Sequence, residues 1–258
     1  MSFSGSVRLA VGTLTVWPTG PVDVNPAVAR VAMAIAPLAV LPLAVVAAAT
    51  AWASDRLGAP NLLTGLLAVA VLAGGTRALH LDGLADTADG LGSGWDRERA
   101  LEVMRRGEIG PMGVVSVVLV LAIQAAAFGE LASGALGAVQ LAVLICCSRA
   151  ALALVCLRGI PAARTGGLGA AVAGSVPRLV GGAVWVAVAA ASIATSLLNG
   201  DSWVAGLVAT LLAVASVAVL LRRCVARLGG VTGDVMGACI EVAGTALAVG
   251  SVLRWPEV

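Results

Sequence analysis

Long apolar runs alternate along the chain with short stretches that carry most of the charges. Several runs reach about 18 uncharged residues, enough for a helix to cross ~30 Å of hydrocarbon. Pro37 and Pro42 are expected to kink the first span, because proline removes a helix hydrogen bond. The pattern predicts seven spans, at about residues 30–53, 60–79, 111–130, 135–157, 179–198, 203–221 and 236–253. The predicted fold class is therefore an all-α, polytopic membrane helical bundle, a single domain over residues 1–258 with re-entrant or interfacial helices on its cytoplasmic side.

Composition supports a membrane protein and excludes several other classes. Hydrophobic residues make up 60% of the chain and charged residues only 12%, whereas globular chains are about 25% charged. A net charge of +2, two Phe and no Tyr give no basis for nucleic-acid binding. The five cysteines form no CxxC pair and are expected to be small buried hydrophobes. The short stretch from Leu9 to Trp17 is expected to be an interfacial segment rather than a signal peptide.

The arginines predict the orientation of the bundle. With seven spans, the loops around 80–110, 158–178 and 222–235 lie on one side together with the N-terminal segment, and they hold most of the arginines. The other side has only Arg56 and Arg254. By the positive-inside rule the rich side is cytoplasmic, which predicts a multi-pass protein of the bacterial inner membrane with its active face in the cytoplasm.

The candidate chemistry lies in a polar loop over residues 77–113. This loop holds the only histidine, His80, and seven of the fourteen acidic residues. Asp82, Asp86 and Asp89 are spaced i, i+4 and i+7, so on a helix that ends near Gly90 they lie within about 60° of one another. Three carboxylates on one stripe repel each other unless a cation lies between them, and oxygen ligands suit Mg²⁺. The alternative is a solvated loop that only connects two spans.

A second short helix is expected after the aspartates, capped by Asp96 and ended by Gly107. Glu102 is placed to pair with Arg105 or Arg106 one turn later. An amphipathic helix lying on the bilayer is the main expectation for this segment. Binding of an anionic substrate by Arg105 and Arg106 is the alternative.

Three further positions on the same side are candidates. Arg149, near the cytoplasmic end of the fourth span, either binds phosphate or extends its head group to the interface. The stretch from 229 to 241 places Gly233 before a membrane helix, whose first N–H groups can hold an anion. Asp234 and Glu241 share a face of that helix, and acids inside spans are functional candidates. The alternative for Asp234 is a simple helix cap.

These motifs together resemble a known family. HLDGLADTADGLGSG at residues 80–94, followed by RGEIGPMG at 106–113, resembles the signature of the cobalamin synthases, the adenosylcobinamide-GDP ribazoletransferases. GGVTGDVMGACIE at 229–241 and CSR at 147–149 are also similar, and the hydropathy resemblance covers essentially the whole chain. Two departures stand out: Leu81 replaces an acid that relatives often carry after the histidine, and Arg106 and Gly107 replace an Asp-Ser pair found in many relatives.

The resemblance implies a membrane enzyme that needs Mg²⁺ and acts late in cobalamin synthesis. It would join adenosylcobinamide-GDP to α-ribazole, or to its 5′-phosphate, and release GMP. In that reaction the three aspartates would hold one or two Mg²⁺ ions on the diphosphate. His80 is a candidate general base, or alternatively it orients a carboxylate. Arg77 and Arg149 are candidates to hold phosphate oxygens.

Two other functions remain as alternatives. A CDP-alcohol phosphotransferase would also place aspartates at a membrane face. Its usual pattern spreads them over a longer run, and no Ala-Arg pair follows the first Asp-Gly here at the spacing of that pattern. A transporter would use Asp234, Glu241 and Arg149 as a path, but no internal repeat is visible. A homo-oligomer is a further possibility that the sequence leaves open.

Overall fold

A computed structural model describes residues 3–253 as a bundle of helices, without a β-strand in that range. The sequence therefore predicted the fold class correctly. Predominantly apolar stretches with few charges form the long helices, because a membrane-embedded backbone satisfies its own hydrogen bonds in that way. In chain order the helices are α1 (Phe3–Leu14), α2 (Pro26–Ala34), α3 (Ala36–Ala39), α4 (Leu41–Arg56), α5 (Asn61–Gly75), α6 (Leu79–Gly92), α7 (Arg97–Val103), α8 (Pro111–Leu131), α9 (Gly134–Ser148), α10 (Ala151–Val155), α11 (Gly167–Val172), α12 (Arg178–Leu198), α13 (Trp203–Leu228) and α14 (Gly233–Val252).

Five continuous segments within the described residues are long and apolar enough to cross a membrane: α8, α9 with α10, α12, α13 and α14. They coincide with the last five predicted spans, and the chain is a multi-pass membrane protein. The predicted span 60–79 corresponds to α5, after which the chain bends by 91° into α6. The predicted span 30–53 is divided among α2, α3 and α4. The breaks fall at Ile35 and Val40, just before Pro37 and Pro42, which confirms the expected effect of the two prolines.

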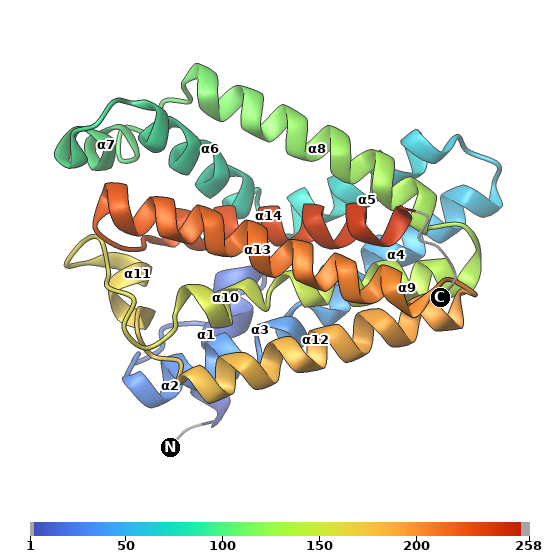
Figure 1. Ribbon diagram of the computed structural model, residues 1–258, viewed down its shortest axis with the longest axis horizontal. Helices are drawn as coiled ribbons and strands as arrows, with labels where there is room; N and C mark the ends of the chain where they lie inside the picture. The colour runs from blue at the N-terminus through green and yellow to red at the C-terminus, as the bar shows by residue number, and fades with distance from the viewer. Residues whose placement is uncertain (1–2, 254–258) are drawn as a thin grey trace.

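The long helices run along the long axis of the molecule, with α14 in the middle of the bundle (Figure 1). α14 packs against α13, α6, α8 and α9. Glycines allow the closest crossings, since a Cβ on Gly250 would lie 2.4 Å from Cα of Ala209 on α13, and one on Gly65 would overlap Ala125 on α8. Small residues give membrane helices this close approach.

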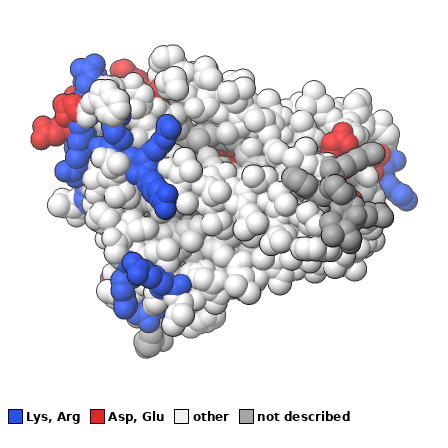
Figure 2. Space-filling view, in the orientation of Figure 1, with Lys and Arg blue, Asp and Glu red and all other residues white. Residues whose placement is uncertain are grey.

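Charge is unequally divided between the two ends of the bundle. The loops 93–110, 157–177 and 229–232 meet at one end, with α7 and α11, and we call it the arginine-rich end (Figure 1). The connection between α4 and α5 lies at the opposite end, with Arg56 as its arginine among the described residues; Arg254 lies outside them. On the face drawn in Figure 2, charged side chains gather at the two ends and leave an almost uncharged band between them.

The N-terminal helix α1 is too short to cross a bilayer, in keeping with the expected interfacial segment. It packs against α2 and α3 through one face. Arg8 donates to the carbonyls of Thr19 and Pro21 and so holds the following loop. All five cysteines are buried and none forms a disulfide, as the sequence predicted.

Candidate active site

A tight bend between α5 and α6 positions the aspartate helix. Arg77 and Ala78 adopt left-handed backbone angles, with φ of 53° and 54°, which non-glycine residues rarely do. Such angles cost about 1–3 kcal/mol each and persist only where the surrounding structure imposes them. The bend turns the chain by 91° and lays α6 along α14. The Arg77 side chain is exposed at this bend.

Two glycines let α6 and α14 come into direct backbone contact. A Cβ on Gly83 would lie 2.6 Å from the carbonyl oxygen of Asp234, and a Cβ on Gly237 would lie 3.1 Å from Cα of His80. The distance at Gly83 leaves no room for a side chain, and the distance at Gly237 is tighter than an ordinary contact. The carboxylates of α6 are thereby set beside the first turn of α14.

Asp82 and Asp86 lie one helical turn apart on α6, and Asp234 faces them from α14. Asp82 is exposed and Asp86 is half-buried. Thr232, not Asp234, caps α14, because its hydroxyl accepts the N–H of Val235 at 3.2 Å. Asp234 instead accepts the Thr232 hydroxyl at 3.1 Å, and its charge acts on both aspartates of α6. The simple-cap alternative for Asp234 is therefore wrong.

Asp82, Thr232 and Asp234, but not Asp86, border a pocket of about 310 Å³ at the arginine-rich end, which we call the aspartate pocket. Asp82 and Asp234 form its acidic side, and Gly233 lies beside them. The loop before α11 forms the other side, with Arg164 as its cation. The remaining lining residues are Leu79, Gly166, Gly167, Leu168, Gly169, Ala170, Val231 and Thr232.

Asp89 is on the same stripe of α6, but its carboxylate is engaged elsewhere. Its two oxygens accept the backbone N–H groups of Gly110 at 2.7 Å and Gly113 at 2.9 Å. These amides open α8, so Asp89 ties the end of α6 to the start of α8. It lines a separate hollow of about 310 Å³ together with Arg106.

The short helix α7 has the predicted cap and the predicted ion pair. The side chain of Asp96 accepts the N–H of Glu98, although the helix ends at Val103, before Gly107. Arg106 donates to Glu102 at 2.7 Å on the exposed surface, and this contact lowers the pKa of the Glu102 carboxyl. Arg105, just after the end of α7, donates to the carbonyl of Leu101 in that helix. Neither arginine lines the aspartate pocket.

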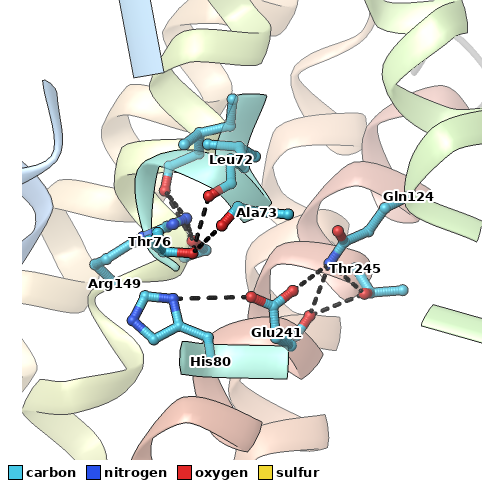
Figure 3. Close-up of polar contacts among 10 residues, drawn as sticks. Leu72, Ala73, Thr76, His80, Gln124, Arg149, Glu241 and Thr245 are labelled. Carbon is cyan, nitrogen blue, oxygen red and sulfur yellow. Dashed lines mark hydrogen bonds and ion pairs between the residues drawn. The ribbon is translucent and has the colours of Figure 1, made fainter. Parts of the chain in front are cut away.

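His80 points away from the aspartate pocket into the bundle. Its side chain is buried, and its Nδ1 lies 3.8 Å from Oε1 of Glu241 on α14 (Figure 3). That distance is too long for a hydrogen bond, and neither ring nitrogen has a hydrogen-bond partner. Gln124 on α8 donates to the other Glu241 oxygen at 2.9 Å and to Thr245 at 3.1 Å. We call His80, Gln124, Arg149, Glu241 and Thr245 the buried polar cluster.

Arg149 completes this cluster from the end of α9. Its Nη1 donates to the carbonyl of Ile145 at 3.0 Å and to the hydroxyl of Ser148 at 2.7 Å, and only 4% of its surface is exposed. Its charge faces Glu241 across a cavity of about 30 Å³, which has room for one or two water molecules. The predicted phosphate contact of Arg149 thus finds no support in this position.

The carboxylates of the aspartate pocket fit Mg²⁺ only with help from a substrate. No group of three or more His, Cys, Asp or Glu side chains between residues 3 and 253 is arranged closely enough to hold a metal ion by itself. Mg²⁺ usually takes one or two carboxylates and completes its shell with water and substrate phosphates. Asp82, Asp86 and Asp234 provide such an oxygen-only set, and their mutual repulsion is the property that a cation would relieve.

Three residues of these sites were not predicted from the sequence: Arg164, Gln124 and Thr245. Arg164 was visible only as part of a basic, glycine-rich loop, because nothing in the sequence shows that this loop meets α6. Gln124 carried a weak signal, since an amide in an otherwise apolar span needs a buried partner.

Comparisons with known proteins agree with the resemblance. Residues 6–252 match the family described as "Cobalamin-5-phosphate synthase". A protein of Nocardioides sp. named "Adenosylcobinamide-GDP ribazoletransferase" is 46% identical over 92% of this chain and 93% of its own. Proteins with the same name from Frankia casuarinae (41% identity; 73% of this chain, 70% of the relative) and Pseudomonas entomophila (42%; 78% and 81%) are also similar. No solved structure matches the chain significantly.

Proposed function

The chain belongs to the cobalamin synthase family and is a transferase of cobalamin synthesis, and we propose that it joins adenosylcobinamide-GDP to α-ribazole or its 5′-phosphate in a Mg²⁺-dependent reaction. The relatives' name supplies the first substrate and the ribazole acceptor. The family match favours this proposal over a lipid phosphotransferase or a transporter.

The observation that carries the proposal is the aspartate pocket. It brings Asp82 from α6 and Asp234 from α14 to one opening at the arginine-rich end, where a soluble substrate can enter. Asp86 does not line this opening, but it is close enough for the charges of Asp82 and Asp234 to act on it. A site with acidic groups on one side and an arginine on the other suits a diphosphate bound together with a divalent cation. Phosphoryl transfer depends mainly on such alignment and charge neutralisation.

In the proposed reaction a ribose hydroxyl of α-ribazole attacks the phosphorus that is attached to cobinamide. A bond forms between that oxygen and phosphorus, the bond to the bridging oxygen breaks, and GMP leaves. Asp82, Asp86 and Asp234 would hold Mg²⁺, which when bound polarises the phosphate oxygens. The direct backbone contact at Gly83 keeps the three carboxylates in a fixed relation, which limits the reorganisation needed in the transition state.

Of the two roles that the sequence left open for His80, we propose the positioning role rather than that of general base. Its ring lies in the buried polar cluster, and it does not line the aspartate pocket. The proton of the attacking hydroxyl would therefore go to a carboxylate oxygen of the pocket. Asp89 would hold α8 rather than metal, because both of its oxygens already accept backbone N–H groups.

We further propose that the arginine-rich end faces the cytoplasm of a bacterial inner membrane, as the positive-inside rule predicts. Arginines of α7, α12 and α13 would then lie at the head-group level beside the pocket opening. A homo-oligomer stays a prediction, which mass measurement of the protein in detergent would test.

The direct test is an assay of GMP release from adenosylcobinamide-GDP by protein reconstituted in liposomes. We expect release only when both α-ribazole and Mg²⁺ are present, and none after chelation of the metal. Asp86→Asn should abolish release in a folded protein, whereas Asp201→Asn, an exposed acid of the α12–α13 loop, should not. Release without the acceptor, or full activity of Asp86→Asn, would contradict the proposal.

A further inference from the structure

Arg164 directly follows a segment of the pocket-lining loop whose backbone is held by hydrogen bonds. Its neighbour Ala163 donates its N–H to the carbonyl of Val231 at 2.9 Å, and Val231 donates to Pro161 at 3.0 Å. Arg97 of α7 donates to the carbonyls of Leu228 and Ala163, at 2.8 and 3.1 Å. The backbone before Arg164 is therefore fixed to both α7 and the start of α14.

The guanidinium of Arg164 makes one hydrogen bond to the described part of the protein, through Nη2. Its Nη2 donates to the carbonyl of Leu101 on α7 at 2.9 Å. Its Nε is buried, and no hydrogen-bond partner is present among the described residues. A buried N–H group without a partner is energetically unfavourable, so binding of a ligand that accepts a hydrogen bond from it would be favoured.

The charge of Arg164 faces the carboxylates of Asp86 and Asp234 without pairing with them. Arg164 is the cation whose charge acts on both groups. Yet the ion pairs found within 4.0 Å among residues 3–253 are His80 with Glu241 and Arg106 with Glu102. A pocket of about 310 Å³, bordered by Arg164, Asp82 and Asp234, lies in this region.

Glycines keep the arginine side of the pocket open for a bulky ligand. Gly166 and Gly167 place no side chain there, and no atom lies within 4 Å of a Cβ built on either one. Gly167 has a φ of +83°, a conformation that favours glycine. Gly169 lies against Thr232, since a Cβ there would be 2.8 Å from its Cα. The loop thus approaches the acidic side closely at one point and leaves space elsewhere.

A ligand that fits between a cation and several carboxylates must present negative charge to one side and positive charge to the other. A diphosphate with bound Mg²⁺ does so, because its free oxygens meet the arginine while its metal meets the carboxylates. Arginine is suited to this contact, since its planar fork can donate two hydrogen bonds to one phosphate. The arginines predicted to hold phosphate do not line this pocket: they are Arg77, Arg105, Arg106 and Arg149.

We propose that Arg164 binds the diphosphate of the nucleotide-linked substrate, opposite the metal-holding carboxylates, and stabilises the charge that GMP carries away. This inference rests on the proposed function and adds to it the residue that contacts the phosphate. Arg164 forms no bond with the substrate. It holds diphosphate oxygens while the acceptor oxygen bonds to phosphorus, the bridging oxygen departs with GMP, and the hydroxyl proton passes to a carboxylate of the pocket.

The test measures binding as well as turnover in the full-length protein reconstituted in nanodiscs. Mg²⁺·GDP is the probe for calorimetric titration, because it carries the diphosphate and cannot be transferred. Arg164→Ala should weaken its binding by about 10- to 100-fold, the effect of losing charge-assisted hydrogen bonds. The KM for adenosylcobinamide-GDP should rise with it. Arg158→Ala, which removes an exposed arginine that does not line the pocket, should bind like wild type.

Arg164→Lys separates substrate contact from the structural bond to Leu101. Lysine keeps the charge but loses the fork, so we expect an intermediate affinity at wild-type thermal stability. Equal binding of Mg²⁺·GDP by wild type, Arg164→Ala and Arg158→Ala would overturn the inference even if GMP transfer persists. Binding that depends on Arg164 in a protein that transfers nothing to α-ribazole would instead overturn the proposed function and leave the phosphate contact supported.

Discussion

Gly83→Ala is the sharpest test of the idea that contact between α6 and α14 sets the geometry of the carboxylates. The added Cβ would lie 2.6 Å from the carbonyl oxygen of Asp234 and 2.9 Å from its Cα. Ordinary contact begins at 3.4 Å, so α6 must move by about 0.8 Å. The obstacle is backbone, which cannot rotate away as a flexible side chain would.

The expected effect is large on activity and small on stability. A misplacement of about 1 Å in a catalytic group lowers rates by roughly 10²-fold, so kcat for GMP release should fall by about that factor. Alanine favours the helix by about 1 kcal/mol over glycine, whereas overpacking costs about 1–3 kcal/mol. The net loss of stability is therefore about 0–2 kcal/mol, and the variant should remain folded.

Two other glycines give a graded series for the same assay. Gly237→Ala meets His80 at 3.1 Å, a milder contact, and should lower kcat less. Gly182→Ala on α12 has open space around its Cβ and should behave like wild type. Steady-state GMP release and thermal unfolding in detergent would be measured for all three. Wild-type kcat in Gly83→Ala would refute the argument, because it would show that Asp82 and Asp86 do not depend on close contact with α14.

Three further predictions concern single carboxylates. Asp89→Asn removes one acceptor from the pair of bonds to the start of α8 and should destabilise the protein by about 1–3 kcal/mol in chemical unfolding. Asp82→Asn, at an exposed position, should abolish GMP release without lowering the unfolding temperature; a drop in both would indicate a structural role. Glu241→Ala leaves the buried Arg149 without the negative charge that faces it and removes an acceptor of the Gln124 amide, so it should cost about 1–3 kcal/mol. Glu241→Gln should cost less than Glu241→Ala, and equal losses would show that polarity at this position does not matter.

The sequence predicted those parts of the fold that depend on local pattern. Long, predominantly apolar runs with few charges became the long helices, because a backbone in hydrocarbon must satisfy its own hydrogen bonds. Pro37 and Pro42 marked the breaks in the first span, and Asp96 capped α7. The stripe of aspartates gave the correct helix and the correct end of the molecule.

The arrangement of the site could not be predicted in the same way, because it depends on contacts between distant segments. The spacing placed Asp89 with Asp82 and Asp86 as a metal ligand. In the structure, however, its two oxygens accept hydrogen bonds from the backbone amides of Gly110 and Gly113. The spacing of the aspartates does not show which carboxylate will accept hydrogen bonds from the N-terminal backbone amides of another helix. Likewise Arg149 has the charge to bind phosphate, yet the packing of α9 turns it toward Glu241.

Helical periodicity explains how the single polar helix α6 contributes both to the buried polar cluster and to the aspartate pocket. Successive residues of a helix differ by about 100°, so His80 and Asp82 point to nearly opposite sides. His80, Leu84 and Thr87 share the buried side, which faces the bundle, whereas Asp82 and Asp86 share the more accessible one. Rotation of α6 by one residue would bury an aspartate without its partners and draw His80 away from Glu241. The buried polar cluster therefore disfavours that rotation. Burying Arg149 and Glu241 is unfavourable in itself, but it fixes the rotation of α6 on which the aspartate pocket depends.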